Sequence, residues 1–422
     1  MRSLFRSVQL QRLRGLDSEA ETQNQPGCFR AAGLMNQRLE FLSRSDRATI
    51  SIMQPDPAPS RREFVTGRAI QTEIERAASL RGDEVLAARD ADSATQAIPA
   101  GGDTVRLGKV AMACDFDVIL NPGPVSRLEA ASAALDLVDQ LEDQMSVYRP
   151  HTELSRLNRL AAGEAFSVEP RLFELLMLAR RLAGDTCGAF DPTAGPLVTL
   201  WRQCKQEHRI PKQTEIDDLR NLIGIDNIEF HAEQRTVRFA RPGVELNLNS
   251  IGKGYALDRA GEILEAAKIE DWLLHGGHSS VLARGGHNGH AGWPIAIRNP
   301  LFPERHFVTI LLRDRGMSTS GSGVQYFRHR GQRYGHIIDP RTGWPVEGML
   351  SVTVLAPTSA EADALSTAFF VLGVEKTIAC CHNLREQQRD VAALILPPPQ
   401  RGRKLEPINC GIPDDQLFVH PP

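Results

Sequence analysis

The chain has 422 residues and a formal net charge of −3, and 41% of its residues are hydrophobic while 24% are charged. This length is enough for one large domain or for two to three ordinary ones. The near-balanced charge provides no basic field for nucleic acid, and no run of 18 apolar residues predicts a transmembrane helix. We therefore expect a globular protein without a nucleic-acid partner and without a transmembrane segment.

The cysteines and one short motif bear on the cellular compartment. The seven cysteines are odd in number and form no Cys-x-x-Cys pair, which argues against a disulfide framework and a thiolate zinc site. The segment "SRREF" at 60–64 resembles the core of a twin-arginine export motif, but the following "VTGRAIQTEIERAASL" is interrupted by charges rather than apolar. The sequence therefore predicts a cytoplasmic protein, with periplasmic export as the alternative.

The composition changes near residue 105. Residues 1–105 are rich in Arg, Ser, Gln, Ala and Asp, and "QPDPAPSRR" and "AIPAGGD" are typical of linkers. We expect a poorly ordered N-terminal extension over 1–105 and the main folded domain over 106–376. Residues 377–422 are predicted to add a C-terminal helix, a strand and a tail to the same domain.

Hydrophobic periodicity predicts a mixture of helices and strands after residue 105. In chain order they are a strand in "VAMACDFDVIL" from Val110, helices over 124–145 and 169–183, a hairpin over 227–240, a strand over 244–249, a helix from Lys253, strands near 272–275, 294–298, 306–312 and 351–356, and a helix over 359–372 that ends at Gly373. There is no regular alternation of strand and helix, so the predicted class is α+β, with mixed or antiparallel sheets and packed helices.

A strand, a glycine-rich turn and a helix start follow one another in "LNSIGKGYALD" (248–258). A helix N-terminus has free N–H groups and a positive dipole end, so it favours phosphate, and Lys253 adds a charge there. The spacing is not that of a P-loop. The alternative is an ordinary strand–helix turn with an exposed lysine.

The segment "TSAEADALSTAFFVLG" (358–373) predicts an apolar helix that contains an acid. Thr358 and Glu361 have capping-box spacing, and Asp363 and Thr367 lie one turn apart on one face. A buried carboxylate needs a partner, which a hard cation can supply. The alternative is a solvent-facing aspartate in the first turn, which the helix dipole favours.

Three further segments carry polar groups among turn residues. In "RYGHIIDPRTGWP" (333–345), His336 is a candidate general base or a core histidine, and Asp339 is expected to cap the following turn. "GAFDPTAGPLVTLW" (188–201) is a candidate binding loop or a loop packed on the core. "HGGHSSVLARGGHNGH" (275–290) holds two His-x-x-His pairs, so it is either a zinc site or a glycine-rich binding loop.

Taken together and in this order, these segments resemble the FAD:protein FMN transferase family, also called ApbE-like flavin transferases. The resemblance covers roughly 110–375 and rests on "MACDFDV", "MSVYRPHTELSRLN", "GAFDPTAGPLVTLW", "NLNSIGKGYALD", "HGGHSS", "STSGSGVQYF", "RYGHIIDPRTGWP" and "EADALSTAFFVLG". It implies an ApbE-like fold and an enzyme that splits FAD at its pyrophosphate with Mg²⁺. It further implies that FMN passes to a threonine or serine of a target flavoprotein and that AMP is released.

The resemblance also implies roles for individual residues. His336 matches the catalytic histidine, and Tyr148 matches the aromatic side chain that packs on the isoalloxazine. The other residues implied to contact FAD are Met112, Ala189, Phe190, Asp191, Asn247, Lys253, Gly276, Gly277 and His278. The implied magnesium ligands are Asp363, Thr367 and a backbone oxygen near Ser250.

The sequence departs from the family pattern at three positions where an acid is common. These positions hold Asn247, His278 and Ser322, so fewer carboxylates are available around a cation. Three alternatives therefore stay open beside the transferase: an FAD pyrophosphatase that uses water as acceptor, a flavin-binding protein without catalysis, and a zinc protein built on the four histidines.

Overall fold

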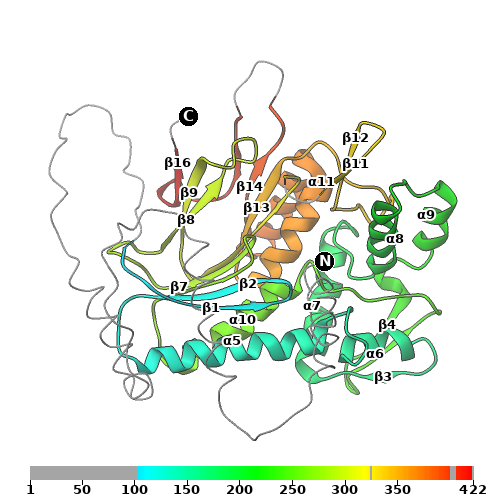
Figure 1. Cartoon of the computed structure of the whole chain (residues 1–422), viewed down its shortest axis with the longest axis horizontal. Helices are drawn as coiled ribbons and strands as arrows, with labels where there is room; N and C mark the ends of the chain where they lie inside the picture. Colours follow the sequence, from blue (N-terminus) through cyan, green and yellow to red (C-terminus); the bar gives the residue numbers. More distant parts are fainter. Residues whose placement is uncertain (1–101, 324–325, 400–404, 421–422) are drawn as a thin grey trace, which may run out of the picture. The chain divides into compact units, whose positions relative to one another are not determined.

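The computed structural model describes residues 102–323, 326–399 and 405–420. The predicted N-terminal extension, with its SRREF segment, lies outside the described residues except for its last few positions. A cytoplasmic location therefore stays a prediction. Within the described part, helices and antiparallel sheets are mixed (Figure 1), which confirms the α+β class.

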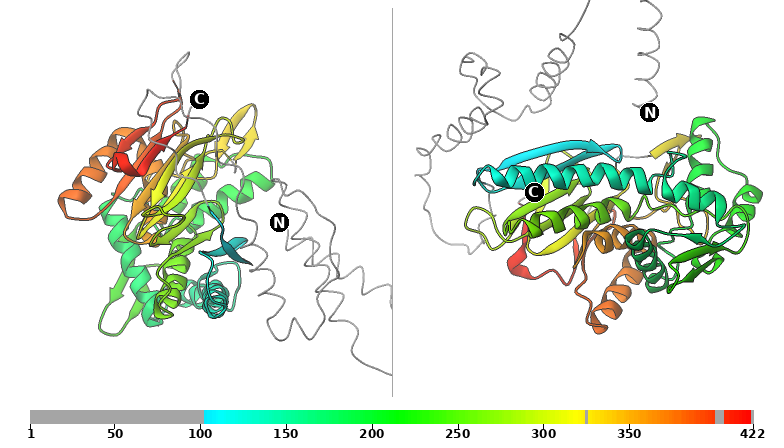
Figure 2. Two further views of the ribbon diagram at one scale, coloured as in Figure 1. Left: turned by 90° about the vertical axis from the view of Figure 1, so that its left-hand side faces the viewer. Right: turned by 90° about the horizontal axis from the view of Figure 1, so that it is seen from below.

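The main sheet of the described part has eight strands, each antiparallel to its neighbours. Their order is β1 (Val105–Ala111), β2 (Cys114–Leu120), β6 (Trp272–Gly276), β7 (Ser280–Arg284), β10 (Arg315–Gly321), β13 (Ser351–Ala356), β14 (Ala392–Leu396) and β15 (Ile408–Cys410). The hairpin of β1 and β2 therefore forms one edge of the sheet and the C-terminal strands form the other, as Figure 2 shows in cyan and red.

Both faces of this sheet are covered. On one face lie α5 (Ser126–Met145), α10 (Gly252–Ala266) and α11 (Ser359–Glu386). On the other lies a three-stranded sheet of β8 (Trp293–Arg298), β9 (His306–Leu312) and β16 (Leu417–Val419). Because successive side chains of a strand point to opposite faces, Leu274 faces the core under the helices and the adjacent Leu273 faces the core under the small sheet.

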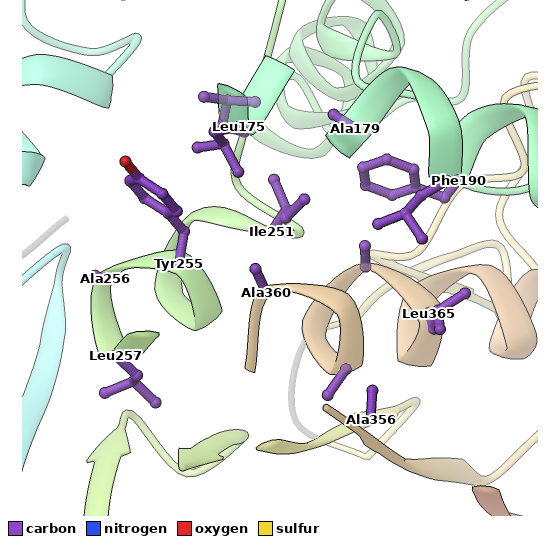
Figure 3. Packing of buried hydrophobic residues seen from close by; sticks show 14 of the residues in the cluster. Leu175, Ala179, Phe190, Ile251, Tyr255, Ala256, Leu257, Ala356, Ala360 and Leu365 are labelled. Carbon is purple, nitrogen blue, oxygen red and sulfur yellow. The ribbon is translucent and has the colours of Figure 1, made fainter. Parts of the chain in front are cut away.

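Further helices and short strands lie between β2 and α10 in the sequence. They are α6 (Glu153–Leu160), β3 (Phe166–Ser167), α7 (Pro170–Asp185), α8 (Gly195–Gln206), α9 (Gln213–Arg220), β4 (Ile228–His231) and β5 (Thr236–Phe239), with a short 3₁₀ turn at Ile225–Asn227. A second 3₁₀ turn, at Asp414–Gln416, precedes β16. Helix α7 contacts α11. Figure 3 shows Leu175 of α7, Ile251 before α10 and Ala360 of α11 close together in the main core.

The segment from Val110 forms a hairpin rather than one strand. The chain reverses at Met112 and Ala113, whose φ angles are 48° and 60°. Two consecutive residues with a left-handed backbone form the tight turn that joins the strands of a hairpin through a two-residue loop. The usual sequence for this turn is Asn-Gly. The sequence pattern missed this turn because neither residue is a turn former.

The predicted strand over 244–249 does not form, and its last residue lies in a turn. Its burial alternates as predicted, since Val244, Leu246 and Leu248 are buried. Its backbone bonds go elsewhere: Leu246 exchanges two hydrogen bonds of 2.9 Å with the side chain of Asn158. The N–H of Asn247 donates to the carbonyl of Pro192 at 2.7 Å.

The last predicted helix breaks at Gly373 as expected, but a second helical segment follows to Glu386. Gly373 has φ 75° and ψ −177°, which lies outside helical geometry. Position 376, which the sequence predicts as the division between the main part of the domain and its C-terminal part, falls inside this helix. By length and composition α11 could cross a membrane, but its N-terminal half is buried against α10, β10 and β13. It is therefore explained as a core helix.

Candidate active site

Helices α10 and α11 cross at very close range. A Cβ added to Gly254 would lie 2.1 Å from the carbonyl oxygen of Ser359, so only glycine fits at this crossing. Each helix also satisfies the other's N-terminal N–H groups. Asp258 accepts bonds from Ser359 and Ala360 at 2.7 and 2.8 Å, and Asp363 accepts one from Gly254 at 3.1 Å.

The carboxylate of Asp363 is buried, with 4% of the residue exposed, so the solvent-facing alternative is wrong. Its Oδ1 accepts hydrogen bonds from the hydroxyls of Ser280 and Ser318, both at 3.0 Å. Its Oδ2 accepts the Gly254 N–H and lies 3.8 Å from Lys253 Nζ. Lys253 is therefore engaged at the helix start rather than fully exposed.

A magnesium ion can be tested against this donor set. A carboxylate offers about four lone-pair sites, and three of those of Asp363 are used by the bonds just described. The hydroxyl of Thr367 lies one turn further along and donates to the Asp363 carbonyl at 3.4 Å, and Ser250 lies in the turn before α10. These are hard oxygen donors of the kind that Mg²⁺ prefers, so the residues present fit that ion as a partial ligand set.

Asp258 has an unusual titration. Burial raises the pKa of its carboxyl to about 7, although the two N–H donors of α11 act in the opposite direction. The carboxylate therefore takes up a proton close to neutral pH while it caps α11. The motif containing Asp258 was identified from sequence, but its capping role was not.

The hairpin turn of β1 and β2 meets the glycine loop after β6. The N–H of Gly277 donates to the Asp115 carbonyl at 2.7 Å. A hollow of about 240 Å³ lies here, and its lining includes Ala113, Cys114, Gly277 and His278. Burial raises the pKa of the Cys114 thiol to about 11 although Lys253 lowers it, so this thiol stays protonated at neutral pH.

Of the predicted FAD contacts in this region, Met112 is partly buried in the hairpin turn and Gly276 is buried at the end of β6. A Cβ on Gly276 would lie 2.8 Å from the ring of Phe116, so this glycine is required by packing within the sheet. Gly277 and His278 are the two that reach the hollow, and His278 is exposed.

His275 is held by an acid–base network beside the same hollow. Its Nε2 lies 3.3 Å from Asp117 Oδ2, and Arg106 binds the same carboxylate through two nitrogens at 2.8 and 2.9 Å. Burial lowers the pKa of His275, and the Asp117 charge raises it only partly. This histidine therefore tends to be neutral at pH 7.

The zinc hypothesis finds no support in the second histidine pair. Both ring nitrogens of His287 are engaged, one by the Gly102 N–H at 2.7 Å and the other by Asn121 Oδ1 at 2.5 Å. Its ring stacks on Trp293 at 4.7 Å. Among the residues that the structure describes, no group of three or more His, Cys, Asp or Glu side chains is arranged to hold a metal.

The predicted contacts Tyr148 and Asn247 are linked through Asn249. The Tyr148 hydroxyl accepts a bond from Asn249 Nδ2 at 2.9 Å, and the Asn249 N–H donates to Asn247 Oδ1 at 2.9 Å. The Tyr148 ring is 56% exposed, and the guanidinium of Arg202 lies 4.9 Å from its centroid. An exposed ring held in this way can stack on a planar ligand.

Ala189 and Phe190 are both 1% exposed and belong to the main core. Figure 3 shows Phe190 there. Asp191 instead lines an open hollow of about 520 Å³ together with Gly188, Pro340 and Arg341. Burial raises the pKa of Asp191, and bonds from Thr193 lower it in part. Of the three FAD contacts predicted in this motif, Asp191 is the one whose side chain is among the described residues that line the hollow.

His336 is exposed and follows β12 (Gln332–Gly335) at a bend, so it is not a core histidine. The next residues form the expected turn. Asp339 accepts the Arg341 N–H at 2.9 Å and forms an ion pair with the Arg341 guanidinium.

Ser322 is the third position that departs from the family pattern. Its backbone N–H donates to the Leu350 carbonyl at 3.0 Å.

Comparisons with known proteins identify the family. Residues 111–395 match the model of the ApbE family. The FAD:protein FMN transferase of Vibrio cholerae is 32% identical over 283 residues, which are 66% of this chain and 84% of that protein. The FAD:protein FMN transferase of Escherichia coli K12 is 33% identical over 254 residues, covering 59% of this chain and 71% of that protein.

Solved structures show the same likeness. The ApbE protein of Thermotoga maritima superposes with a TM-score of 0.64 at 28% identity, covering 72% of this chain and 96% of that one. The flavin transferase ApbE of Vibrio cholerae gives 0.62 at 29% identity, covering 73% and 97%. The class of protein defined by these matches is a transferase. The chain belongs to the ApbE family.

Proposed function

We propose that this chain is a Mg²⁺-dependent FAD:protein FMN transferase. In this proposal it cleaves the FAD pyrophosphate, attaches FMN through a phosphoester to a threonine or serine of a target flavoprotein, and releases AMP. The names of the relatives support the flavin substrate and the protein acceptor. The observation that carries the proposal is that Lys253 and Asp363 meet at the N-terminus of α10.

That meeting point suits a pyrophosphate. The first N–H groups of α10 and the Lys253 ammonium favour the negative phosphates. When bound, Mg²⁺ would neutralise charge that develops on phosphate oxygens, and Asp363 with Thr367 and a backbone oxygen near Ser250 would hold it. Asp363 already has Ser280 and Ser318 to orient it, so its position does not depend on the ion.

The remaining predicted residues have complementary tasks. The exposed Tyr148 ring would stack on the isoalloxazine, while Asp191, Asn247 and the backbone at Gly277 would bind polar parts of FAD. His336 would accept the proton of the incoming hydroxyl as its oxygen attacks phosphorus and the bond to AMP breaks. Its exposure on the bend after β12 leaves room for a protein acceptor.

The proposal is tested by incubating the full chain with FAD, with Mg²⁺ or EDTA, and with or without a flavoprotein that carries an acceptor threonine. Covalent flavin on the acceptor together with released AMP supports it. Free FMN without covalent product would identify a pyrophosphatase instead, and intact FAD would identify a flavin-binding protein. His336→Ala should remove transfer while FAD binding stays the same.

A further inference from the structure

The hairpin before His336 concentrates positive charge. Strands β11 (Tyr326–His329) and β12 form a separate two-stranded sheet, seen beside α8 in Figure 1. From 326 to 336 the sequence reads YFRHRGQRYGH, with three arginines, two histidines and no acid. The chain as a whole is acidic at −3, so this basic character is local.

One face of the hairpin anchors it to the protein. Phe327 and Tyr334 lie opposite each other and stack with centroids 5.4 Å apart. Both rings also pack on Trp201 of α8, at 6.2 and 5.7 Å. This aromatic cluster fixes which face of the hairpin points outward.

The outward face pairs two like charges. Arg328 lies directly opposite Arg333 across the two strands, and both are exposed. Like charges in that position destabilise a sheet. The β4–β5 hairpin shows the ordinary arrangement, with Glu229 opposite Arg238. The arginine pair is therefore unfavourable for the folded protein alone, which points to an anionic partner.

The three arginines of the hairpin have no acidic partner among the residues that the structure describes. In the part of the chain that the structure describes, no ion pair involves Arg328, Arg330 or Arg333. Arg333 lies 4.0 Å over the Tyr326 ring and donates to the Ser322 carbonyl. Its guanidinium is thus oriented on the outward face without being neutralised.

We propose that the outward face of β11–β12 binds an acidic segment of the acceptor protein and so brings its hydroxyl to His336. The inference rests on the proposed function. β12 ends one residue before His336, so a segment held on the hairpin lies beside that side chain. Each strand also has an edge without a strand partner among the described residues, where an extended segment can add main-chain hydrogen bonds.

The direct test measures peptide binding by fluorescence anisotropy. Three labelled peptides of equal length each carry one threonine, flanked by glutamates, glutamines or lysines. We expect the glutamate peptide to bind about tenfold more tightly than the glutamine peptide at low ionic strength, with the advantage reduced by salt. Arg328→Glu with Arg333→Glu should remove that advantage. Equal binding of the glutamate and glutamine peptides would overturn the proposal.

A matched control uses Arg298→Glu with Arg305→Glu, which changes the net charge equally at two exposed arginines of the β8–β9 hairpin. The control should bind the glutamate peptide like the unmodified chain. Arg328→Glu alone creates a Glu–Arg cross-strand pair, so its melting temperature should be unchanged or higher while peptide binding falls. If peptide binding falls while the melting temperature is unchanged or higher, the loss of binding cannot come from unfolding.

FAD binding separates this inference from the proposed function. Flavin fluorescence should give the same Kd for FAD in the double variant as in the unmodified chain. If the double variant binds the glutamate peptide normally but FAD about tenfold more weakly, the arginines serve the nucleotide and the inference is wrong. If the peptide binds as expected but flavin transfer to proteins never occurs, the inferred peptide-binding surface is supported and the proposed function is wrong.

Discussion

Asp258 and Asp363 each cap the helix that carries the other. Asp258 of α10 accepts the first N–H groups of α11, and Asp363 of α11 accepts the Gly254 N–H of α10. The same exchange places Lys253 3.8 Å from Asp363. The proposed phosphate site is therefore part of the contact that holds the two helices together, and its variants must be tested for stability as well as activity.

The crossing itself predicts the effect of a single methyl group. Gly254→Ala would place a Cβ 2.1 Å from the Ser359 carbonyl oxygen, so the helices must separate. We expect a loss of about 2–3 kcal/mol in the free energy of unfolding, measured by urea denaturation. The control is Gly184→Ala in α7, where an added Cβ meets nothing within 4 Å. That variant should be neutral or more stable by up to about 1 kcal/mol.

The structural role of Asp363 and its proposed metal-binding role can be tested separately. Asp363→Ala leaves the donors of Ser280, Ser318 and Gly254 without an acceptor, so we expect a loss of about 2–4 kcal/mol in stability. Asp363→Asn keeps an acceptor oxygen and should cost less. Both should abolish Mg²⁺-dependent FAD turnover. Full turnover by a folded Asp363→Asn protein would disprove the metal assignment.

The raised pKa of Asp258 predicts that the stability of the protein depends on pH. Its pKa is about 7 in the folded protein and has an ordinary value of 3.8, so the folded state binds the proton more tightly than the unfolded chain. The resulting stabilisation is fully present below about pH 4 and is lost as the pH rises through 7. Compared with the unmodified chain, Asp258→Asn should remove this decline between pH 4 and 7. Parallel curves of melting temperature against pH would contradict the prediction.

Tyr148 should contribute to FAD binding through its ring. Tyr148→Ala removes an exposed ring, so we expect about a tenfold rise in the Kd for FAD and little change in melting temperature. Tyr148→Phe keeps the ring and loses only the bond from Asn249. It should bind FAD almost normally, and equal weakening in both variants would show that the hydroxyl matters instead.

The sequence predicted the elements with strong periodicity, such as β9, β13 and α5, because their buried faces repeat at regular spacing. For Asp363 it left two interpretations open, a buried carboxylate and a solvent-facing one, and the structure shows the buried one. The sequence could not predict the partners Ser280 and Ser318, which lie 83 and 45 residues away. Only the packing of α11 on β7 and β10 brings them together.

Two other features of the structure, a turn and the position of a side chain, were not predicted from the sequence, for local reasons. The turn at Met112 and Ala113 was missed because the required left-handed backbone is imposed by strand pairing rather than by a turn-forming residue. The sequence also did not predict that Phe190 lies in the core while the adjacent Asp191 faces the hollow. The sequence contains both residues, but not the direction in which each side chain points.

The exchange of caps between α10 and α11 joins positions far apart in the chain. Asp363 and Gly254 are separated by 109 residues, and most of the main sheet lies between or around them. During synthesis, Lys253 leaves the ribosome long before its carboxylate partner exists, so the proposed phosphate site cannot form on the partial chain. A nascent chain is thus expected to acquire FAD only after α11 has docked, which would make flavin binding a marker of completed folding.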